Sequence, residues 1–190
     1  MWYGLAWASF GALHSALAAE SVKAALGLGR YSRLAYNGFA ALHLGVIWWL
    51  GKFWLSDAAP LGLAPAVGTI GDGVTVFGLV VIAVALMGYD RGRFLGTTQL
   101  RAPEAAEDEN LRIDGLHRFV RHPLYSGLFL VLWGHAQTEF ALATALWGSV
   151  YLVIGAGFEE RRLIDRYGTA YRTYRARVPA FVPWRGRVEV

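Results

Sequence analysis

Two polar clusters late in the chain hold residue types that could do chemistry. The first gathers basic, aromatic and small residues around a histidine: His117, Arg121, His122, Pro123, Tyr125 and Gly127. The second is the adjacent carboxylate pair Glu159 and Glu160, which directly follows an apolar stretch. Carboxylates and aromatic faces both attract cations, so together these clusters would suit a cationic ligand at a membrane boundary.

Each cluster also has a structural explanation. Arg121 could anchor at lipid headgroups and Pro123 could start a helix at its first position, with His122 incidental. Glu159 and Glu160 would lie at the carboxyl end of a helix, where the dipole disfavours anions, so they need a cationic partner. That partner is either a neighbouring arginine (Arg121, Arg161 or Arg162) or a bound ligand, and both possibilities remain open.

The elements that must position these clusters are hydrophobic. The chain is 55% hydrophobic and 17% charged, with a mean hydropathy of +0.36, which is typical of a membrane protein. Its low-charge stretches are Trp2–Ala19, Leu34–Gly51, Val74–Tyr89, Leu124–Ala136 and Phe140–Phe158. Because a spanning helix needs roughly 20 apolar residues, the fourth stretch is too short to cross unaided. We expect an all-α, polytopic integral membrane protein with about five transmembrane helices.

Charge sets the expected orientation. Seventeen of the 18 Lys and Arg residues fall in alternate loops or in the C-terminal tail, and Lys52 is the exception. The positive-inside rule therefore predicts an inner-membrane protein with its N-terminus outside and its C-terminus in the cytoplasm. The excess charge would meet anionic membrane lipid, so it calls for no nucleic-acid partner. The first stretch lacks a basic leader and a cleavage site, which favours a retained helix.

One domain is expected over residues 1–190. It comprises N-terminal spans 1–89, a cytoplasmic loop 90–122, and a hairpin with a tail over 123–190. Region 55–73, rich in Gly and Pro, reads as an irregular external connection. The chain has no cysteine, which excludes disulfides, thiolate metal sites and a cysteine nucleophile, and no metal site is predicted. Histidines within the spans, such as His14 and His43, could line a cavity, but hydrogen bonding between helices is the commoner role.

Regular spacing predicts how the last helices pack. Gly127 and Gly134 lie seven residues apart, as do Gly148 and Gly155, so each pair marks a face where backbones can approach closely. Beyond the fifth stretch, apolar residues recur every three or four positions: Leu163, Tyr167, Tyr171, Tyr174 and Val178. This pattern predicts a C-terminal amphipathic interfacial segment. Gly168 is expected to end one helix in the left-handed conformation, and Thr169 to cap the next.

The two clusters also carry a family resemblance. LRIDGLHRFVRHPLYSG from Leu111 and FEERRLIDRYGTAYRTYRARVPAFVP from Phe158 resemble the C-terminal signature of integral-membrane methyltransferases. These include isoprenylcysteine carboxyl methyltransferase and phospholipid N-methyltransferases. Upstream, LHSALAAESVK from Leu13 and GRYSRLAYNGFA from Gly29 are similar to the NnrU-like and methanethiol S-methyltransferase branch. His117 departs from the pattern, because the family usually has Tyr there.

The resemblance implies an S-adenosylmethionine-dependent methyltransferase whose substrate enters from the bilayer. It places the cofactor against residues of both clusters and of the tail: His122, Pro123, Tyr125, Gly127, Glu159, Glu160, Tyr171 and Tyr174. Candidate catalytic residues are Glu160, His117 and Arg172. Methyl transfer needs mainly positioning and electrostatics from the protein, because the cofactor supplies the reactive group.

The acceptor and the reaction class stay open at this point. A carboxylate acceptor needs no base, whereas a thiol or an ammonium group must first lose a proton, for which His117 or Glu160 is available. Two other functions compete with methyl transfer. One is an NADPH-dependent membrane reductase of sterol or isoprenoid type, and the other is a non-catalytic NnrU-like accessory protein. Binding of S-adenosylmethionine, of NADPH or of neither would separate the three.

Overall fold

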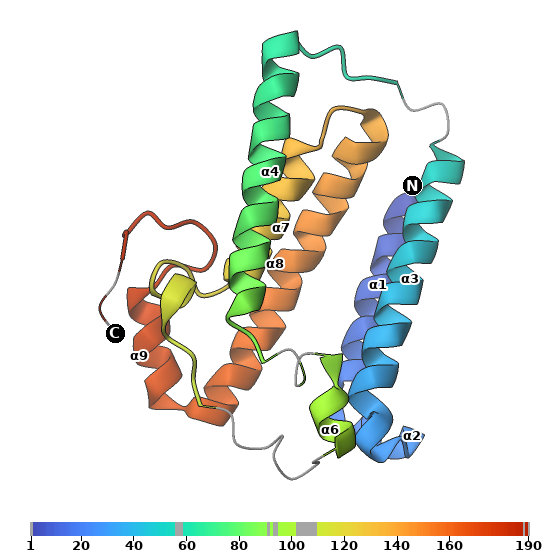
Figure 1. Cartoon of the computed structure of the whole chain (residues 1–190). Coiled ribbons are helices and arrows are strands. Elements are labelled where there is room, and N and C mark those ends of the chain that lie inside the picture. The colour runs from blue at the N-terminus through green and yellow to red at the C-terminus, as the bar shows by residue number, and fades with distance from the viewer. Residues whose placement is uncertain are drawn as a thin grey trace. The chain divides into compact units, whose positions relative to one another are not determined.

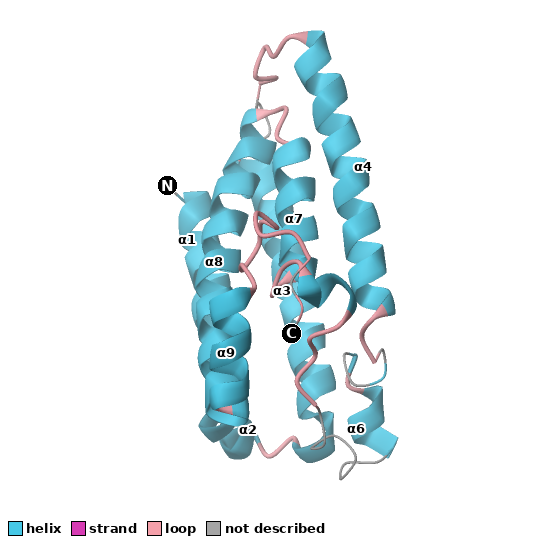
Figure 2. Ribbon diagram, turned by 90° about the vertical axis from the view of Figure 1, so that its left-hand side faces the viewer, coloured by secondary structure: helices cyan, strands magenta, loops and turns pink. Residues whose placement is uncertain are grey.

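The computed structural model describes residues 2–55, 59–90, 92, 95–101, 110–187 and 189. Every regular element in these ranges is a helix, and the sole strand-like pairing among them is an isolated bridge between Pro60 and Thr138 (Figures 1 and 2). The all-α prediction is confirmed. The chain forms two compact units, residues 1–57 with 89–109 and residues 58–88 with 110–190.

The first unit is built on two helices in contact, α1 (Trp2–Ala18) and α3 (Ser32–Trp54). Its shorter elements are α2 (Glu20–Leu26), the 3-10 helix η1 (Gly29–Tyr31) and α6 (Thr97–Arg101). Aromatic residues of α1 form much of its buried interior: Tyr3, Trp7 and Phe10. Two polar contacts join the helices, Ser9 to His43 at 3.3 Å and Tyr36 to His14. Hydrogen bonding between helices, the commoner role expected of His14 and His43, is confirmed.

The second unit holds both polar clusters. Its helices are α4 (Pro65–Met87), α7 (Pro123–Gly134), α8 (Glu139–Tyr167) and α9 (Thr169–Arg177), with the 3-10 helix η3 (Gly115–Arg118) before α7. Among the described helices, α4 and α8 are long and apolar enough to cross a membrane, and α7 is a shorter apolar helix. The five-span count is not confirmed. The prediction of an irregular connection over 55–73 is wrong from Pro65 onward, because Pro65 occupies the first turn of α4, where its missing N–H costs nothing.

Glycines bring α4 and α7 into backbone contact. A Cβ at Gly127 would lie 2.9 Å from the Gly78 carbonyl oxygen, and a Cβ at Gly134 would lie 2.6 Å from that of Gly71. Close approach at Gly127 and Gly134 is therefore confirmed, and α4 supplies its own glycine pair seven residues apart. Gly155 on α8 has nothing within 4 Å of its Cβ position, so close approach at this glycine is wrong for the described part of the chain.

Helix α8 runs beyond its apolar part and then turns sharply into α9. Gly168 makes the turn with φ 55° and ψ −125°, so its φ is positive as expected, but it is not in the left-handed helical region. Gly168, not Thr169, precedes the first turn of α9, and the cap prediction for Thr169 is wrong. The apolar face of α9 packs inside the protein: Tyr171, Tyr174 and Val178 are at most 3% exposed and lie against Leu163 and Ile164.

Candidate functional site

The two polar clusters meet where α7 begins and α8 leaves its apolar part. Pro123 opens α7 and is buried, and His122 immediately precedes it. Glu160 lies in the polar part of α8 and reaches both Arg121 and His122. Helices α7 and α8 pack together through the short connection 135–138, which places these ends close to each other. The site therefore depends on the hairpin that the sequence predicts.

Arg121 links α8 to the end of α9. Its Nε and Nη2 lie 2.8 and 2.6 Å from Glu160 Oε1, and both side chains are largely buried, at 12% and 13% exposed. Its Nη1 donates to the backbone oxygens of Val178 at 2.5 Å and Arg175 at 3.2 Å. These carbonyls lie at the carboxyl end of α9, where unsatisfied oxygens and the dipole favour a cation. Arg121 thus caps one helix while it neutralises a carboxylate on another.

His122 is buried between two carboxylates and two aromatic rings. Its Nε2 lies 3.1 Å from Glu160 Oε1, and its Nδ1 lies 3.7 Å from Glu159 Oε2. The Tyr125 ring stacks on the imidazole at 5.4 Å, and the Phe181 ring lies 5.6 Å away. With 5% of its surface exposed, His122 is the buried polar residue of the described core.

The tail covers this corner with backbone hydrogen bonds. The Arg121 and His122 N–H groups donate to the oxygens of Pro179 at 2.8 Å and Ala180 at 3.0 Å. The Ser126 hydroxyl donates to the Phe181 oxygen at 2.7 Å. Segment 179–181 is therefore fixed against the start of α7, although it contains no regular secondary structure.

Two tyrosines of α9 complete the corner, and they differ in the hydrogen bonding of their hydroxyl groups. The Tyr174 hydroxyl donates to the His117 carbonyl oxygen at 2.8 Å. The Tyr171 hydroxyl is buried and has no hydrogen-bond partner among the described residues. Burial is the main cause that raises the pKa of Tyr171 to about 12; the charges of Glu160 and Glu159 add to this shift, and the neighbouring Arg121 opposes it. The Tyr171 hydroxyl is thus a protonated donor that can serve a ligand.

His117 is oriented as a neutral imidazole. Its Nδ1 lies 3.2 Å from the Arg121 carbonyl oxygen, which can only accept, so Nδ1 carries a proton. Burial is the main cause that lowers the pKa of His117 below the ordinary imidazole value. The arrangement favours a neutral ring at physiological pH.

Other predicted residues lie outside this corner. Arg172 is exposed on α9, and no hydrogen bond or ion pair joins its side chain to Glu160, His122 or Tyr171 among the described residues. Gly127 faces α4, so its contacts there are those of helix packing. Arg91 and Arg93, which contribute to the loop charge, and stretch 102–109 of that loop lie outside the described residues.

Some contributors had no role assigned from sequence. These are Arg175, 3.6 Å from Glu160 Oε2, together with Ser126 and Phe181. Their contacts are largely to backbone oxygens and ring faces. The spacing of residue types in a sequence does not predict such contacts. Only the resemblance, which extends through Pro183, indicated that the tail takes part.

The donor set fits a sulfonium cofactor. S-adenosylmethionine carries a sulfonium, an amine, a carboxylate and an adenine ring. Carboxylates and aromatic faces suit its cationic groups, and a buried hydroxyl suits a polar one. Glu159 is the half-exposed carboxylate of the corner, with 46% of its side chain accessible, and the Tyr171 hydroxyl is its unpaired buried donor. These two groups, with the rings of Tyr125 and Phe181, are the residues best placed to hold it.

No family model and no solved structure matches the chain. Among curated proteins, it is 34% identical over 148 residues to a methanethiol S-methyltransferase of Bradyrhizobium diazoefficiens, covering 77% of this chain and 48% of that protein. It is 30% identical over 142 residues to the methanethiol S-methyltransferase of Pseudomonas deceptionensis, covering 69% and 53%.

A more distant match is the protein-S-isoprenylcysteine O-methyltransferase of Schizosaccharomyces pombe, 31% identical over 88 residues, covering 43% of this chain and 36% of that protein. The chain spans about half the length, or less, of the curated relatives it matches. On these grounds the chain belongs to the superfamily of membrane methyltransferases that includes the methanethiol S-methyltransferases and the isoprenylcysteine O-methyltransferase.

Proposed function

We propose that the protein transfers a methyl group from S-adenosylmethionine to a small or lipophilic acceptor at the cytoplasmic face of the inner membrane. The observation that carries this proposal is the buried corner in which His122 lies between Glu159 and Glu160. There the Tyr171 hydroxyl has no hydrogen-bond partner among the described residues. A buried donor without a partner is costly unless a ligand completes it. The names of the relatives support methyl transfer as the reaction class, and the buried corner supports this location for it.

Each residue of the corner has a distinct part in this proposal. When bound, S-adenosylmethionine supplies an electrophilic methyl group on sulfur, and the protein supplies position and charge. Glu159 attracts the cationic groups of the cofactor, and Tyr171 donates a hydrogen bond to it. Glu160 and Arg121 hold His122 and the end of α9 in place, because their own charges already neutralise each other at 2.6 Å.

The acceptor class that we favour is a small thiol. The two relatives matched over two thirds or more of this chain are named for methanethiol. A thiol must lose its proton before it attacks, and a neutral imidazole can take that proton. The hydrogen bond between His117 Nδ1 and the Arg121 carbonyl oxygen holds the ring in one orientation for such a role. In this proposal His117 is the general base. A carboxylate acceptor would need no base, because it is already deprotonated.

The test uses the full chain purified in detergent. Labelled S-adenosylmethionine and labelled NADPH are compared by equilibrium dialysis, and methyl transfer is then measured with methanethiol, a prenylcysteine and a phospholipid amine. We expect S-adenosylmethionine to bind and a thiol to be methylated, with the Tyr171→Phe variant binding the cofactor more weakly. NADPH binding alone would favour a reductase, and binding of neither ligand would favour an accessory protein.

A further inference from the structure

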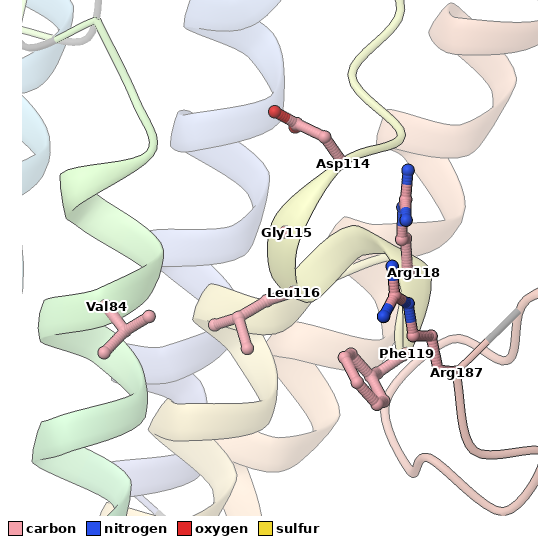
Figure 3. Close-up of a pocket in the computed structure, with 7 residues that line it drawn as sticks. All are labelled: Val84, Asp114, Gly115, Leu116, Arg118, Phe119 and Arg187. Atoms are coloured by element: carbon pink, nitrogen blue, oxygen red, sulfur yellow. The ribbon is translucent and has the colours of Figure 1, made fainter. Parts of the chain in front are cut away.

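A cavity lies in the second unit, beside the carboxyl end of α4 and apart from the His122 corner. Its volume is about 380 Å³, and it is lined by Val84, Asp114, Gly115, Leu116, Arg118, Phe119 and Arg187. Figure 3 shows Val84 of α4 across from Leu116 of η3, with Arg118, Phe119 and Arg187 farther from α4. At about 30 Å³ for each water molecule, the cavity could hold roughly a dozen waters, which is enough for a glycerophosphate group.

Among the described residues, the charge at this cavity is positive and not neutralised. Asp114 is its acidic residue, and its carboxylate already accepts from Arg112 Nε at 2.9 Å. That hydrogen bond is the main cause that holds the pKa of Asp114 below its usual range. Neither the Arg118 nor the Arg187 guanidinium forms a hydrogen bond or an ion pair with another described residue. Two guanidinium groups at one cavity repel each other, and a shared anion would relieve that repulsion.

The apolar side of the cavity continues along α4. Val84 is 46% exposed, and Val80, Phe77 and Val76, one and two turns before it on the same face, are 52%, 60% and 61% exposed. Helix α4 is one of the two described helices that could cross a membrane, and Val84 lies one turn before its end at Met87. An exposed apolar strip on a helix that could span a membrane therefore leads to two guanidinium groups that pair with no other described residue.

We propose that this cavity binds the headgroup phosphate of an anionic phospholipid. Arg118 and Arg187 hold the phosphate, and the acyl chains lie along Val84, Val80 and Phe77. Guanidinium groups suit phosphate because they offer several parallel donors in a fixed plane. The proposal requires α4 to span the membrane, and it is independent of the methyl-transfer chemistry assigned to the His122 corner.

The experiment titrates the full chain in detergent with dioleoyl phosphatidylglycerol or with dioleoyl phosphatidylcholine, and counts bound lipid by native mass spectrometry. The phosphatidylglycerol should bind more tightly than the tail-matched zwitterionic lipid. The double variant Arg118→Gln/Arg187→Gln should bind phosphatidylglycerol about tenfold more weakly, the effect of losing roughly 1.4 kcal/mol. Arg162→Gln, which removes an exposed charge from α8, is the matched control and should bind like the wild type.

Further measurements distinguish the possible sources of the anion and test whether a variant is misfolded. The variant Arg118→Lys/Arg187→Lys keeps the charge and should retain most of the binding, which separates loss of charge from loss of fold. Excess glycerol 3-phosphate should not displace the lipid, because it lacks acyl chains. Displacement by glycerol 3-phosphate or by S-adenosylmethionine would overturn the proposal, the latter by assigning the cavity to the cofactor. Equal binding of both lipids, or an unaffected double Gln variant, would overturn it as well.

Discussion

Arg121 binds a single carboxylate oxygen of Glu160 through two of its nitrogens, at 2.8 and 2.6 Å. The same oxygen accepts from His122 at 3.1 Å, so three donors converge on it. Concentrated hydrogen bonding of this kind stabilises the charged carboxylate in a largely buried position. The Glu160 side chain therefore organises the corner before any ligand arrives.

Glu160→Gln should destabilise the protein more than Glu159→Gln. An amide keeps the shape but leaves Arg121 without a counter-charge at 12% exposure, so we expect a loss of about 2 kcal/mol in the free energy of unfolding. Glu159 is 46% exposed, and its change should cost less than about 1 kcal/mol. Unfolding in detergent micelles measures both. Equal losses would contradict the organising role given to Glu160.

Tyr171→Phe and Tyr174→Phe should separate ligand binding from stability. The Tyr171 hydroxyl has no partner among the described residues, so its removal should leave the free energy of unfolding unchanged or raise it by up to about 1 kcal/mol. The Tyr174 hydroxyl donates to the His117 oxygen, and its removal should cost about 1 kcal/mol.

In the binding assay Tyr171→Phe should have the larger effect on cofactor affinity, whereas Tyr174→Phe has the larger effect on stability. Loss of one hydrogen bond to the cofactor corresponds to about fivefold weaker binding for Tyr171→Phe, whereas Tyr174→Phe should bind nearly as the wild type does. Isothermal titration with S-adenosylmethionine gives both values. Cofactor affinity unaffected by Tyr171→Phe would remove this hydroxyl from the site.

Glycine substitutions should test the contact between α4 and α7. Gly134→Ala puts a methyl group 2.6 Å from the Gly71 oxygen, so the helices must separate, at a cost of about 1 to 3 kcal/mol. Gly73→Ala on α4 is the control, because nothing lies within 4 Å of its Cβ position. That change should stabilise the protein by up to about 1 kcal/mol. Melting temperatures of the two purified variants check the difference, and similar shifts would refute the close packing.

The stability of the protein should fall in mild acid partly because of His117. Burial lowers the pKa of this imidazole in the folded state, so as pH falls below the unfolded value of about 6.5 the unfolded chain takes up a proton first. Stability from this residue is present above pH 6.5 and is lost as pH falls toward the folded pKa. The difference in unfolding free energy between wild type and His117→Gln, measured from pH 8 to pH 5, should shrink with acidity. A constant difference would exclude this linkage.

Reporter fusions should establish the number of spans, because only two described helices meet the length and hydropathy of a membrane span. Charge distribution predicts that a fusion after Lys52 lies outside, and that fusions after Arg101 and at the C-terminus lie in the cytoplasm. Alkaline phosphatase should be active in the first and inactive in the other two. An active enzyme fused to the C-terminus would overturn the five-span topology.

Sequence patterns predicted the elements near the site better than the contacts within it. Pro123 at the start of α7 and the long apolar run before Glu159 have clear local signals, and both helices form as expected. Region 65–73 was misread because Gly and Pro usually break helices, whereas here Pro65 starts one and Gly71 serves packing. Such glycine roles depend on a partner helix, which local sequence does not specify.

The candidate site likewise contains some contacts that the sequence predicts and others that it does not. Opposite charges made pairing of Arg121 with Glu160 one of the two explanations open from sequence, and the structure realises it. The second task of Arg121, at the carbonyls of Val178 and Arg175, could not be predicted, because every residue has a carbonyl. The same holds for segment 179–181, whose contacts to α7 are mostly through the backbone.

The pairing of segment 179–181 with Arg121 and His122 has a consequence for biosynthesis. Because synthesis runs from the N-terminus, Arg121 and His122 are made well before segment 179–181, so their N–H groups at first lack these partners. The N–H groups of Arg121 and His122 must then remain hydrated until Pro179 and Ala180 arrive. The corner can therefore close only once the C-terminal tail has been made, so a chain truncated before residue 179 would be unable to complete it.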